Sequence, residues 1–381
     1  MKIFYTIFTT SHGNGGHFYS LATTAKALSA EADVVIINFG LNKSTVIESS
    51  GIKTYNILMN SNEIGKAHKR FNNIIKEENP DVLHSFCTLS YFFVRKYAIL
   101  KPIKIILTKC GGPNPKRYFP IAKNLILYSK ENLDFFKSKK KFRSSNLYLI
   151  PNRVIEQKTD QTRIDELKNF LQLKKPQKIF LRIGRIARHY ESSIIQAINL
   201  VNELNKKENN YILLLIGSIQ SQKIYDALQK INNNSLKIIS DNHFTNNASE
   251  LIDIADFVIG TGRSLMEAAA KGKILLTPNK NSKYPVLINE ENFKPLFENN
   301  FSPRGFVSVD DNFHEKMLQD LQSINKRYNE FSRELFLKYF DINSKISHYL
   351  DIYAPTEVHK EKVSVDFLFH YLFLKNYLRK Y

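Results

Sequence analysis

One segment in the second half of the sequence carries residue types suited to binding a phosphate and a sugar. The apolar run 257–259 is followed by Gly260, Gly262 and Arg263, and a helical composition begins directly afterwards. Glycines between a strand and a helix let the backbone approach a ligand, and the free amides of the helix N-terminus attract phosphate. Glu267 would lie one turn into that helix, where its carboxylate could accept hydrogen bonds from two hydroxyl groups, as a ribose offers. The simpler interpretation is that Glu267 complements the helix dipole and Gly262 shapes a turn.

A second candidate, Arg185, follows Gly184 at the end of the apolar run 179–183. A guanidinium at that point could neutralise a departing diphosphate, which is the main electrostatic demand of a reaction with such a leaving group. The alternative is a surface arginine paired with an acid. Arg185 and Glu267 are the two residues for which we predict a catalytic role.

Two further glycine loops follow strand-like runs in the first half. The loop 13–16 is a weak signal alone, because any turn between a strand and a helix can contain glycine. His12 and His17 flank it as titratable groups, although a single histidine is more often structural or merely exposed. Lys109 precedes the glycine pair 111–112 and could place positive charge near an acceptor or donor phosphate, or it could be an ordinary loop lysine.

The run 260–272, Gly-Thr-Gly-Arg-Ser-Leu-Met-Glu-Ala-Ala-Ala-Lys-Gly, resembles the donor-binding segment of family 4 of the GT-B glycosyltransferases, many of which build bacterial surface polysaccharides. The resemblance implies transfer of a sugar from a nucleotide-sugar donor to a hydroxyl acceptor, a lipid-linked or surface glycan. Other matching segments follow the family's order: 13–17, 79–84, 149–152, 183–186 and 214–217. Over the matching positions, we expect donor contacts from Gly15, Gly16, Gly184, Arg188, Gly217, Gly262, Arg263, Ser264 and Leu265, with His17 and Lys109 on the acceptor side.

The sequence departs from the family's pattern at the end of the site that would face the sugar. Ile259 stands where the family commonly has a glutamate, Phe86 where it often has a histidine, and Arg153 where it has a glycine. The family's lysine after the arginine is also absent, and Arg188 or His189 could replace it. The ends of the site that would bind the donor phosphate and the ribose therefore match, whereas the donor sugar and the stereochemical outcome stay open.

The elements that must position these residues alternate along the chain as strand and helix, which is typical of parallel α/β sheets. We predict two Rossmann-like, doubly wound domains facing each other across a cleft, with ligands at the carboxyl ends of their strands. The domains are expected at 1–165, on the acceptor side, and at 166–335, which binds the nucleotide sugar. The resemblance implies that the C-terminal helices, 336–381, return to the first domain. Strands are expected at 3–9, 33–38, 53–57, 82–85, 104–107, 125–128, 147–150, 179–183, 211–216, 236–240, 257–259 and 274–277, with helices between them, including one at 248–254, and helical sequence from 312 onward.

Length and composition agree with this organisation. A chain of 381 residues favours about two domains. The two cysteines form neither a disulfide framework nor a metal site, no Asp-x-Asp motif is present, and we expect no metal and no cofactor. No run reaches the roughly 18 to 20 apolar residues of a spanning helix, and the apolar N-terminus is too short for a signal peptide. We therefore expect a cytoplasmic protein.

The net charge of +19 raises affinity for polyanions such as phosphates, anionic lipid or nucleic acid. The tail 363–381 adds a candidate membrane contact, because a helix there would align aromatic and leucine side chains and end in cations. The alternative is that this stripe packs on the protein or on a second subunit. We expect peripheral association with an anionic membrane surface, on the inner face of the cell membrane. The stripe comprises Phe367, Tyr371, Leu374, Leu378 and Tyr381, and the cations are Lys375, Arg379 and Lys380.

Three other functions are alternatives to this interpretation of the sequence. A nicotinamide-dependent oxidoreductase needs a third glycine that the loop 13–18 lacks. A GT-B-like binding protein without activity is favoured by the missing sugar-facing residues. Nucleic acid is not an expected partner, because the lysines are spread along the chain and accompany no reader motif.

Overall fold

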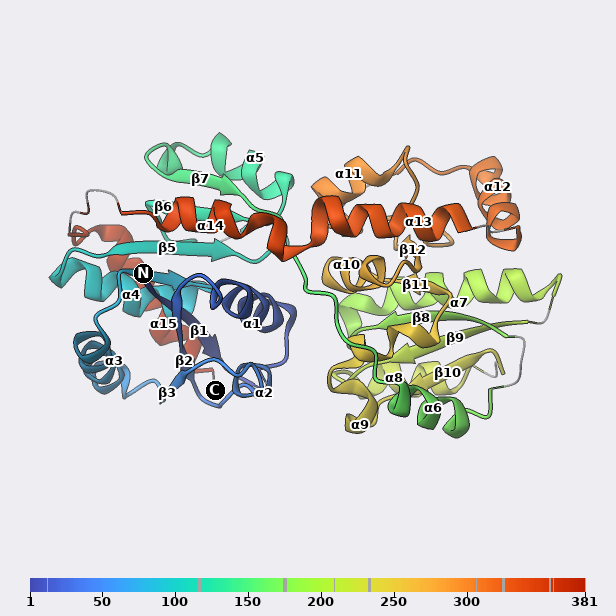
Figure 1. Ribbon diagram of the computed structural model, residues 1–381, viewed down its shortest axis with the longest axis horizontal. Coiled ribbons are helices and arrows are strands. Elements are labelled where there is room, and N and C mark those ends of the chain that lie inside the picture. The colour runs from blue at the N-terminus through green and yellow to red at the C-terminus, as the bar shows by residue number, and fades with distance from the viewer. Residues whose placement is uncertain are drawn as a thin grey trace. The chain divides into compact units, whose positions relative to one another are not determined.

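The computed structural model divides the chain into two compact units (Figure 1). Unit 1 comprises Met1–Arg153 and Ile342–Tyr381, and unit 2 comprises Val154–Asp341. The structure describes residues 1–381 except 12, 116–117, 174–176, 209, 232–233, 306, 324–325, 356–357, 359 and 381. The predictions for His12 and Tyr381 therefore lie outside the described residues.

Unit 1 is built on a seven-stranded sheet with the order β3-β2-β1-β4-β5-β6-β7, in which all the pairings are parallel. Its central strands are continuous apolar runs, as expected for strands covered by helices on both faces. The chain reverses its direction of travel across the sheet between β1 and β4. The strands are β1 (Lys2–Thr9), β2 (Asp33–Gly40), β3 (Thr54–Leu58), β4 (Val82–Ser85), β5 (Lys104–Lys109), β6 (Asn124–Leu127) and β7 (Asn146–Leu149).

The helices of unit 1 begin and end at residues suited to those positions. The Ser129 side chain accepts a hydrogen bond from the Asn132 amide at 3.2 Å and so caps α5. Asn79 ends α3 in the left-handed conformation, with φ of 47°. The helices are α1 (Gly16–Leu28), α2 (Thr45–Glu48), α3 (Ile64–Glu78), α4 (Thr88–Leu100), α5 (Lys130–Ser138) and the 3-10 turn η1 (Lys140–Phe142).

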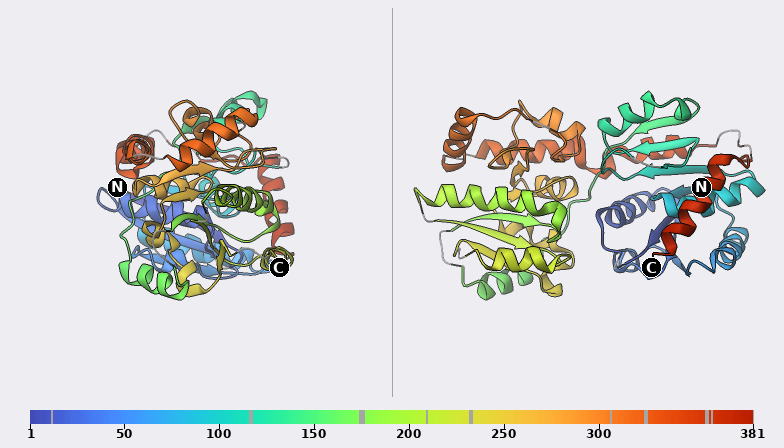
Figure 2. Two further views of the ribbon diagram at one scale, coloured as in Figure 1. Left: turned by 90° about the vertical axis from the view of Figure 1, so that its right-hand side faces the viewer. Right: turned by 180° about the vertical axis from the view of Figure 1, so that it is seen from behind.

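The chain re-enters unit 1 after unit 2. The 3-10 turn η5 (Ile342–Lys345) and α14 (Ile346–Tyr353) are followed by α15 (Val365–Leu378). The Lys104 ammonium donates to the Ala354 carbonyl at 2.7 Å, which fixes the end of α14 to β5. Helix α15 packs against α4 (Figure 2), where Arg95 and Asp366 form an ion pair of 3.0 Å.

Unit 2 is built on a six-stranded sheet with the order β10-β9-β8-β11-β12-β13. All the pairings are parallel except that of β13 with β12, and the direction of travel reverses between β8 and β11. The expected α/β class with two doubly wound units is thereby confirmed. The strands are β8 (Lys178–Ile183), β9 (Tyr211–Ile216), β10 (Leu236–Ile239), β11 (Phe257–Ile259), β12 (Ile274–Thr277) and β13 (Val286–Leu287).

The helices of unit 2 include several that the sequence analysis did not separate. The expected helix at 248–254 is the 3-10 helix η3 (Ala248–Ile254), which follows Asn247 in the left-handed conformation. Within unit 2, the helical region from 312 comprises two α-helices and a π-helical turn rather than one continuous run. The elements are α6 (Gln161–Phe170), α7 (Glu191–Asn205), α8 (Gln222–Gln229), α9 (Asn242–Thr245), α10 (Arg263–Ala270), α11 (Phe293–Glu298), α12 (Asp311–Gln322), α13 (Lys326–Leu335), the 3-10 turn η2 (Arg188–Tyr190) and the π-turn η4 (Phe336–Phe340).

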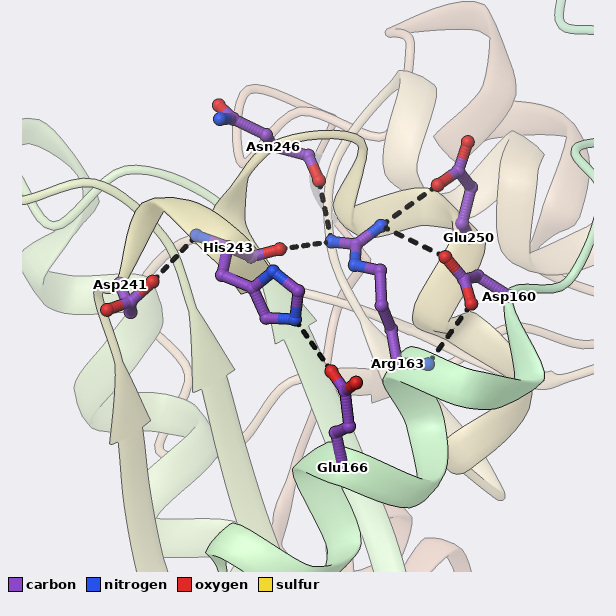
Figure 3. Close-up of polar contacts among 7 residues, drawn as sticks. All are labelled: Asp160, Arg163, Glu166, Asp241, His243, Asn246 and Glu250. Atoms are coloured by element: carbon purple, nitrogen blue, oxygen red, sulfur yellow. Dashed lines mark hydrogen bonds and ion pairs between the residues drawn. The ribbon is translucent and has the colours of Figure 1, made fainter.

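The segment before α6 belongs to unit 2, so the division falls after Arg153 rather than near 165. Figure 3 shows the reason: the Arg163 guanidinium of α6 is surrounded by groups from the rest of unit 2. It pairs with Glu250 at 2.9 Å and donates to the carbonyls of His243 and Asn246 at 2.6 and 2.8 Å. These contacts hold α6 against α9 and η3.

Candidate functional site

The two segments with predicted catalytic residues follow neighbouring strands, β8 and β11, at the carboxyl edge of the unit 2 sheet. β8 pairs with β11 in parallel, with Phe180 opposite Phe257. Gly184 and Arg185 follow β8 directly, and the 260–262 turn follows β11. Because both strands run in the same direction, both loops lie at the same edge, at the point where the strand order reverses. Ligands of doubly wound sheets bind at such a point.

The glycines of the 260–262 turn are required by the local backbone. Gly262 has φ of 54° and ψ of −121°, a combination that residues with a side chain rarely adopt. A Cβ on Gly260 would lie 2.3 Å from the Ser264 hydroxyl, which itself donates to the Thr261 carbonyl at 3.2 Å. The Leu265 side chain is fully buried in the core. Ser264 and Leu265, predicted to bind the donor, can therefore offer their first-turn amides, whereas their side chains are committed to the turn and to the core.

Glu267 and Arg263 form a nearly buried pair. The Arg263 Nε donates to the Glu267 Oε1 at 2.8 Å, and each side chain is only 11% exposed. Burial raises the pKa of Glu267, and the Arg263 charge opposes that rise. Among the described residues, the Oε2 atom of Glu267 has no hydrogen-bond partner. The pair thus holds a carboxylate one turn inside α10 with an acceptor oxygen still available.

Arg185 contacts Tyr190 and no described carboxylate. Its Nη2 donates to the Tyr190 hydroxyl at 3.0 Å, and its guanidinium lies 5.5 Å from the centre of the Tyr190 ring. The alternative interpretation, an arginine paired with an acid, has no counterpart among the described residues. Arg188 and His189, the proposed substitutes for the family's lysine, are exposed in η2, and the His189 ring lies 4.1 Å from the Tyr190 ring.

The sequence analysis missed Arg182, which lies next to this group. Its side chain is 6% exposed and donates through Nη2 to the Ser193 hydroxyl at 2.5 Å. Burial lowers the pKa of Arg182 to about 10. The available signal was a charged residue between the apolar residues Leu181 and Ile183 near the end of the strand Lys178–Ile183.

One predicted donor-binding glycine, Gly217, has a structural reason that involves no ligand. A Cβ on Gly217 would lie 1.8 Å from the Gly184 carbonyl oxygen, so the ends of β9 and β8 approach too closely for any side chain. The Gly184 amide donates to the Ile216 carbonyl at 3.0 Å. A Cβ on Gly184 would lie 3.3 Å from Arg182 Nη1. Gly217 shapes the edge, and its role as a donor contact stays a prediction.

In unit 1 the glycines 13, 15 and 16 lie between β1 and the start of α1. Gly13, with φ of 62°, is pressed against Ser44, whose hydroxyl donates to its carbonyl at 2.5 Å. Gly15 is the N-cap of α1, and a Cβ on the exposed Gly16 would meet nothing within 4 Å. The half-buried His17 ring lies 4.3 Å from the Phe18 ring. The backbone at Gly16 is therefore accessible, and its contact with the donor stays a prediction.

Lys109 ends β5, and its ammonium donates to the Gly111 carbonyl of its own turn. The nearby switch point of unit 1, between β1 and β4, is filled by a buried polar network. The His84 Nδ1 lies 2.7 Å from the Tyr353 hydroxyl, and its Nε2 lies 2.6 Å from the Thr108 hydroxyl. Burial lowers the pKa of His84 to about 3, so this imidazole is neutral. Both of its ring nitrogens are paired with hydroxyl groups of the protein.

Two negative findings concern the described residues only. No group of three or more His, Cys, Asp or Glu residues that could hold a metal ion occurs there. Within the same part of the chain, every helix is too short or too polar to cross a membrane.

No protein-family profile matches the sequence. No curated protein matches it either. Solved structures do match: a glycosyltransferase from Rickettsia africae is similar with a TM-score of 0.64 and 17% identity, over 92% of this chain and 97% of that chain. Anabaena Alr3699/HepE in complex with UDP-glucose has a TM-score of 0.64 and 14% identity, over 92% and 99% of the two chains. UDP-GlcNAc 2-epimerase from Neisseria meningitidis, bound to UDP-GlcNAc, has a TM-score of 0.56 and 12% identity, over 92% and 99%. The expected GT-B fold is confirmed by these similarities.

Proposed function

We propose that this protein is a glycosyltransferase that moves a sugar from a nucleoside-diphosphate donor to an acceptor hydroxyl. The observation that carries the proposal is the carboxyl edge of the unit 2 sheet. There Arg185 follows β8 without a described acidic partner, and the Arg263–Glu267 pair follows the adjacent β11. Similar folds bind UDP-glucose in HepE and UDP-GlcNAc in the epimerase.

Each of these residues then has a stated task. The bond between the anomeric carbon and the diphosphate oxygen breaks, and a bond to the acceptor oxygen forms as that hydroxyl loses its proton. Arg185 compensates the negative charge that develops on the departing diphosphate. The Glu267 Oε2 accepts hydrogen bonds from ribose hydroxyl groups, and the α10 amides face a phosphate. Cationic side chains supply the compensation, so we propose that the reaction needs no metal ion and no cofactor.

The acceptor is proposed to be a lipid-linked or surface glycan, reached at an anionic membrane surface. The net charge of +19 supports this. So does α15, although not through the stripe expected from the sequence. Leu374 and Leu378 are buried, and Phe367 and Tyr371 pack on the same core. The opposite face of α15 carries three exposed apolar side chains instead: Leu368, Phe369 and Leu372, at 57%, 55% and 43% exposure.

Product formation tests the enzymatic proposal. UDP-, GDP- and CMP-sugars are first screened for thermal stabilisation, since a ligand of the native state raises its stability. Turnover is then measured with the stabilising donor for the wild type, Arg185→Ala and Lys207→Ala, an exposed cation of unit 2. We expect a loss of about 100-fold or more for Arg185→Ala and none for Lys207→Ala. Stabilisation without any product would favour a binding protein over an enzyme, and equal turnover of all three proteins would remove Arg185 from the mechanism.

Sedimentation with liposomes tests the membrane proposal. The full chain is compared with a triple variant in which Leu368, Phe369 and Leu372 are serine. We expect binding to anionic and not to neutral vesicles, reduced in the variant. Absence of charge-dependent binding by the full chain would refute the membrane partner, and equal binding by both proteins would exclude α15 from it.

A further inference from the structure

Unit 2 contains a buried cation that no described carboxylate compensates. Arg182 is 6% exposed, its Nη2 donates to the Ser193 hydroxyl at 2.5 Å, and its Nε has no hydrogen-bond partner. A buried charge is normally paired with an opposite charge, because removing it from water is costly. Burial lowers the pKa of this guanidinium to about 10, so it still carries its proton at neutral pH.

A second cation shares the same aromatic ring. The Arg182 and Arg185 guanidinium carbons lie 5.8 and 5.5 Å from the centre of the Tyr190 ring. Each contact is favourable by itself, because the ring face is negative. The two positive charges nevertheless repel each other, and neither has an acidic partner among the described residues. An anion bound beside Tyr190 would supply a negative partner to both guanidinium groups and reduce their mutual repulsion.

The position of Arg182 in the strand directs it to the candidate site. It is the last but one residue of β8, and its Nη1 lies 3.3 Å from where a Gly184 side chain would begin. Ser193, its hydrogen-bond partner, lies in the first turn of α7 and also donates to the Tyr190 carbonyl at 2.7 Å. One hydroxyl thus positions both Arg182 and the η2 turn that carries Tyr190.

We propose that Arg182 is a phosphate-binding residue, which together with Arg185 forms a two-guanidinium site for the diphosphate of the donor. This inference rests on the proposed function, because it assigns the anion to the nucleoside diphosphate. Tyr190 holds the two cations apart and in place. Glycine at 184 leaves the phosphate oxygens room to approach the Nη1 atom of Arg182, which a side chain at that position would crowd.

The proposal predicts that substitution of Arg182 affects thermal stability and diphosphate affinity differently. Replacing Arg182 by methionine, which has a similar length and no charge, removes a buried uncompensated cation. The ligand-free protein should therefore keep its thermal midpoint or gain stability, while affinity for the diphosphate falls. If the role of Arg182 were purely structural, the Arg182→Met protein would be less stable, and the contribution of the phosphates to its binding affinity would be unchanged.

The experiment is isothermal titration calorimetry with UDP, GDP and ADP and with the nucleoside of whichever binds. The proteins are the wild type, Arg182→Met, Arg182→Lys and Tyr225→Phe, a half-buried matched control elsewhere in unit 2. We expect Arg182→Met to bind the diphosphate 10- to 100-fold more weakly, about 1.4 to 2.8 kcal/mol, with nucleoside affinity unchanged. Arg182→Lys keeps the charge and should lie between the two.

The outcomes distinguish the two proposals. Equal diphosphate affinity of the wild type and Arg182→Met would overturn the role of Arg182 and leave the proposed function intact. Parallel losses for diphosphate and nucleoside would also overturn it, since they indicate a distorted pocket. Failure of the wild type to bind any of the three diphosphates would refute the proposed function and the inference with it. If Arg182→Met does not fold, the role is structural unless Arg182→Lys folds and shows the selective loss.

Discussion

Replacing Tyr353 by phenylalanine should lower the free energy of opening of unit 1, because the Tyr353 hydroxyl of α14 completes a hydrogen-bond network at the central strands of that unit. The Tyr353 hydroxyl lies 2.7 Å from His84 Nδ1 and 3.0 Å from the Tyr5 hydroxyl, and all three side chains are buried. Burial raises the pKa of Tyr353 and lowers that of His84, so the network consists of neutral groups.

The magnitude follows from the groups left behind. Removing the hydroxyl strands the His84 nitrogen and the Tyr5 hydroxyl in the core, and each unsatisfied group costs about 1 to 3 kcal/mol. We expect a total loss of about 2 to 6 kcal/mol in the free energy of opening, which corresponds to a roughly 30- to 25,000-fold larger open population.

The two cysteines provide the assay, since Cys87 and Cys110 are both free and both lie in unit 1. Thiol labelling at a fixed pH then reports the opening of this unit alone, as a labelling rate. Tyr371→Phe is the matched control: this half-buried tyrosine of α15 has no hydrogen-bonded hydroxyl among the described residues. A change below about 0.5 kcal/mol for Tyr353→Phe, or the same change in the control, would refute the role of the hydroxyl.

Three further predictions concern glycine, charge and pH. Gly262→Ala should destabilise unit 2 by about 1 to 3 kcal/mol because of its positive φ, whereas Gly65→Ala, inside α3, should be neutral or stabilising; calorimetric unfolding of both variants checks this, and equal effects would contradict it. Asp366→Asn should accelerate hydrogen exchange in α15, since it leaves the buried arginine of α4 unpaired; unchanged exchange would show that apolar packing alone holds the helix. Burial lowers the pKa of His84 to about 3 and that of His370 to about 4. The unfolded state therefore takes up protons first, and stability should fall below about pH 6.5, by about 2 kcal/mol per histidine at pH 5; urea midpoints that stay level between pH 7 and pH 5 would contradict this.

The sequence was sufficient for the features that depend on neighbouring residues. Apolar runs such as 211–216 identified the strands, and the glycines after β8 and β11 identified the edge where a ligand would bind. The expectation of helical sequence in the tail is also met by α15. These features can be recognised without tertiary information, because a parallel strand that is buried on both faces consists of consecutive apolar residues.

The features that depend on distant residues could not be predicted in this way. Gly217 is a glycine because of the carbonyl of Gly184 on the next strand. The Arg263–Glu267 pair could have been proposed from its spacing of four residues, yet its burial depends on the surrounding core. The tail helix is apolar around its circumference, so its sequence alone did not decide which face packs. Contact with α4 decided it.

Unit 1 is discontinuous, whereas unit 2 occupies the single stretch Val154–Asp341. During synthesis all of unit 2 is therefore translated before the 40 residues 342–381 of unit 1. At about 5 to 20 residues per second, synthesis of these residues lasts about 2 to 8 s. Until Tyr353 is added, the first sheet is present without the hydroxyl that pairs with His84 Nδ1.

The order of folding should follow from this arrangement. Unit 2 has its full sequence while unit 1 still lacks α14 and α15, and these helices then complete the unit that was begun first. Helix α15 covers Phe92 and the neighbouring apolar surface of α4 only as the final step. The part of the protein made earliest is thus the part that stays exposed to chaperones and proteases longest.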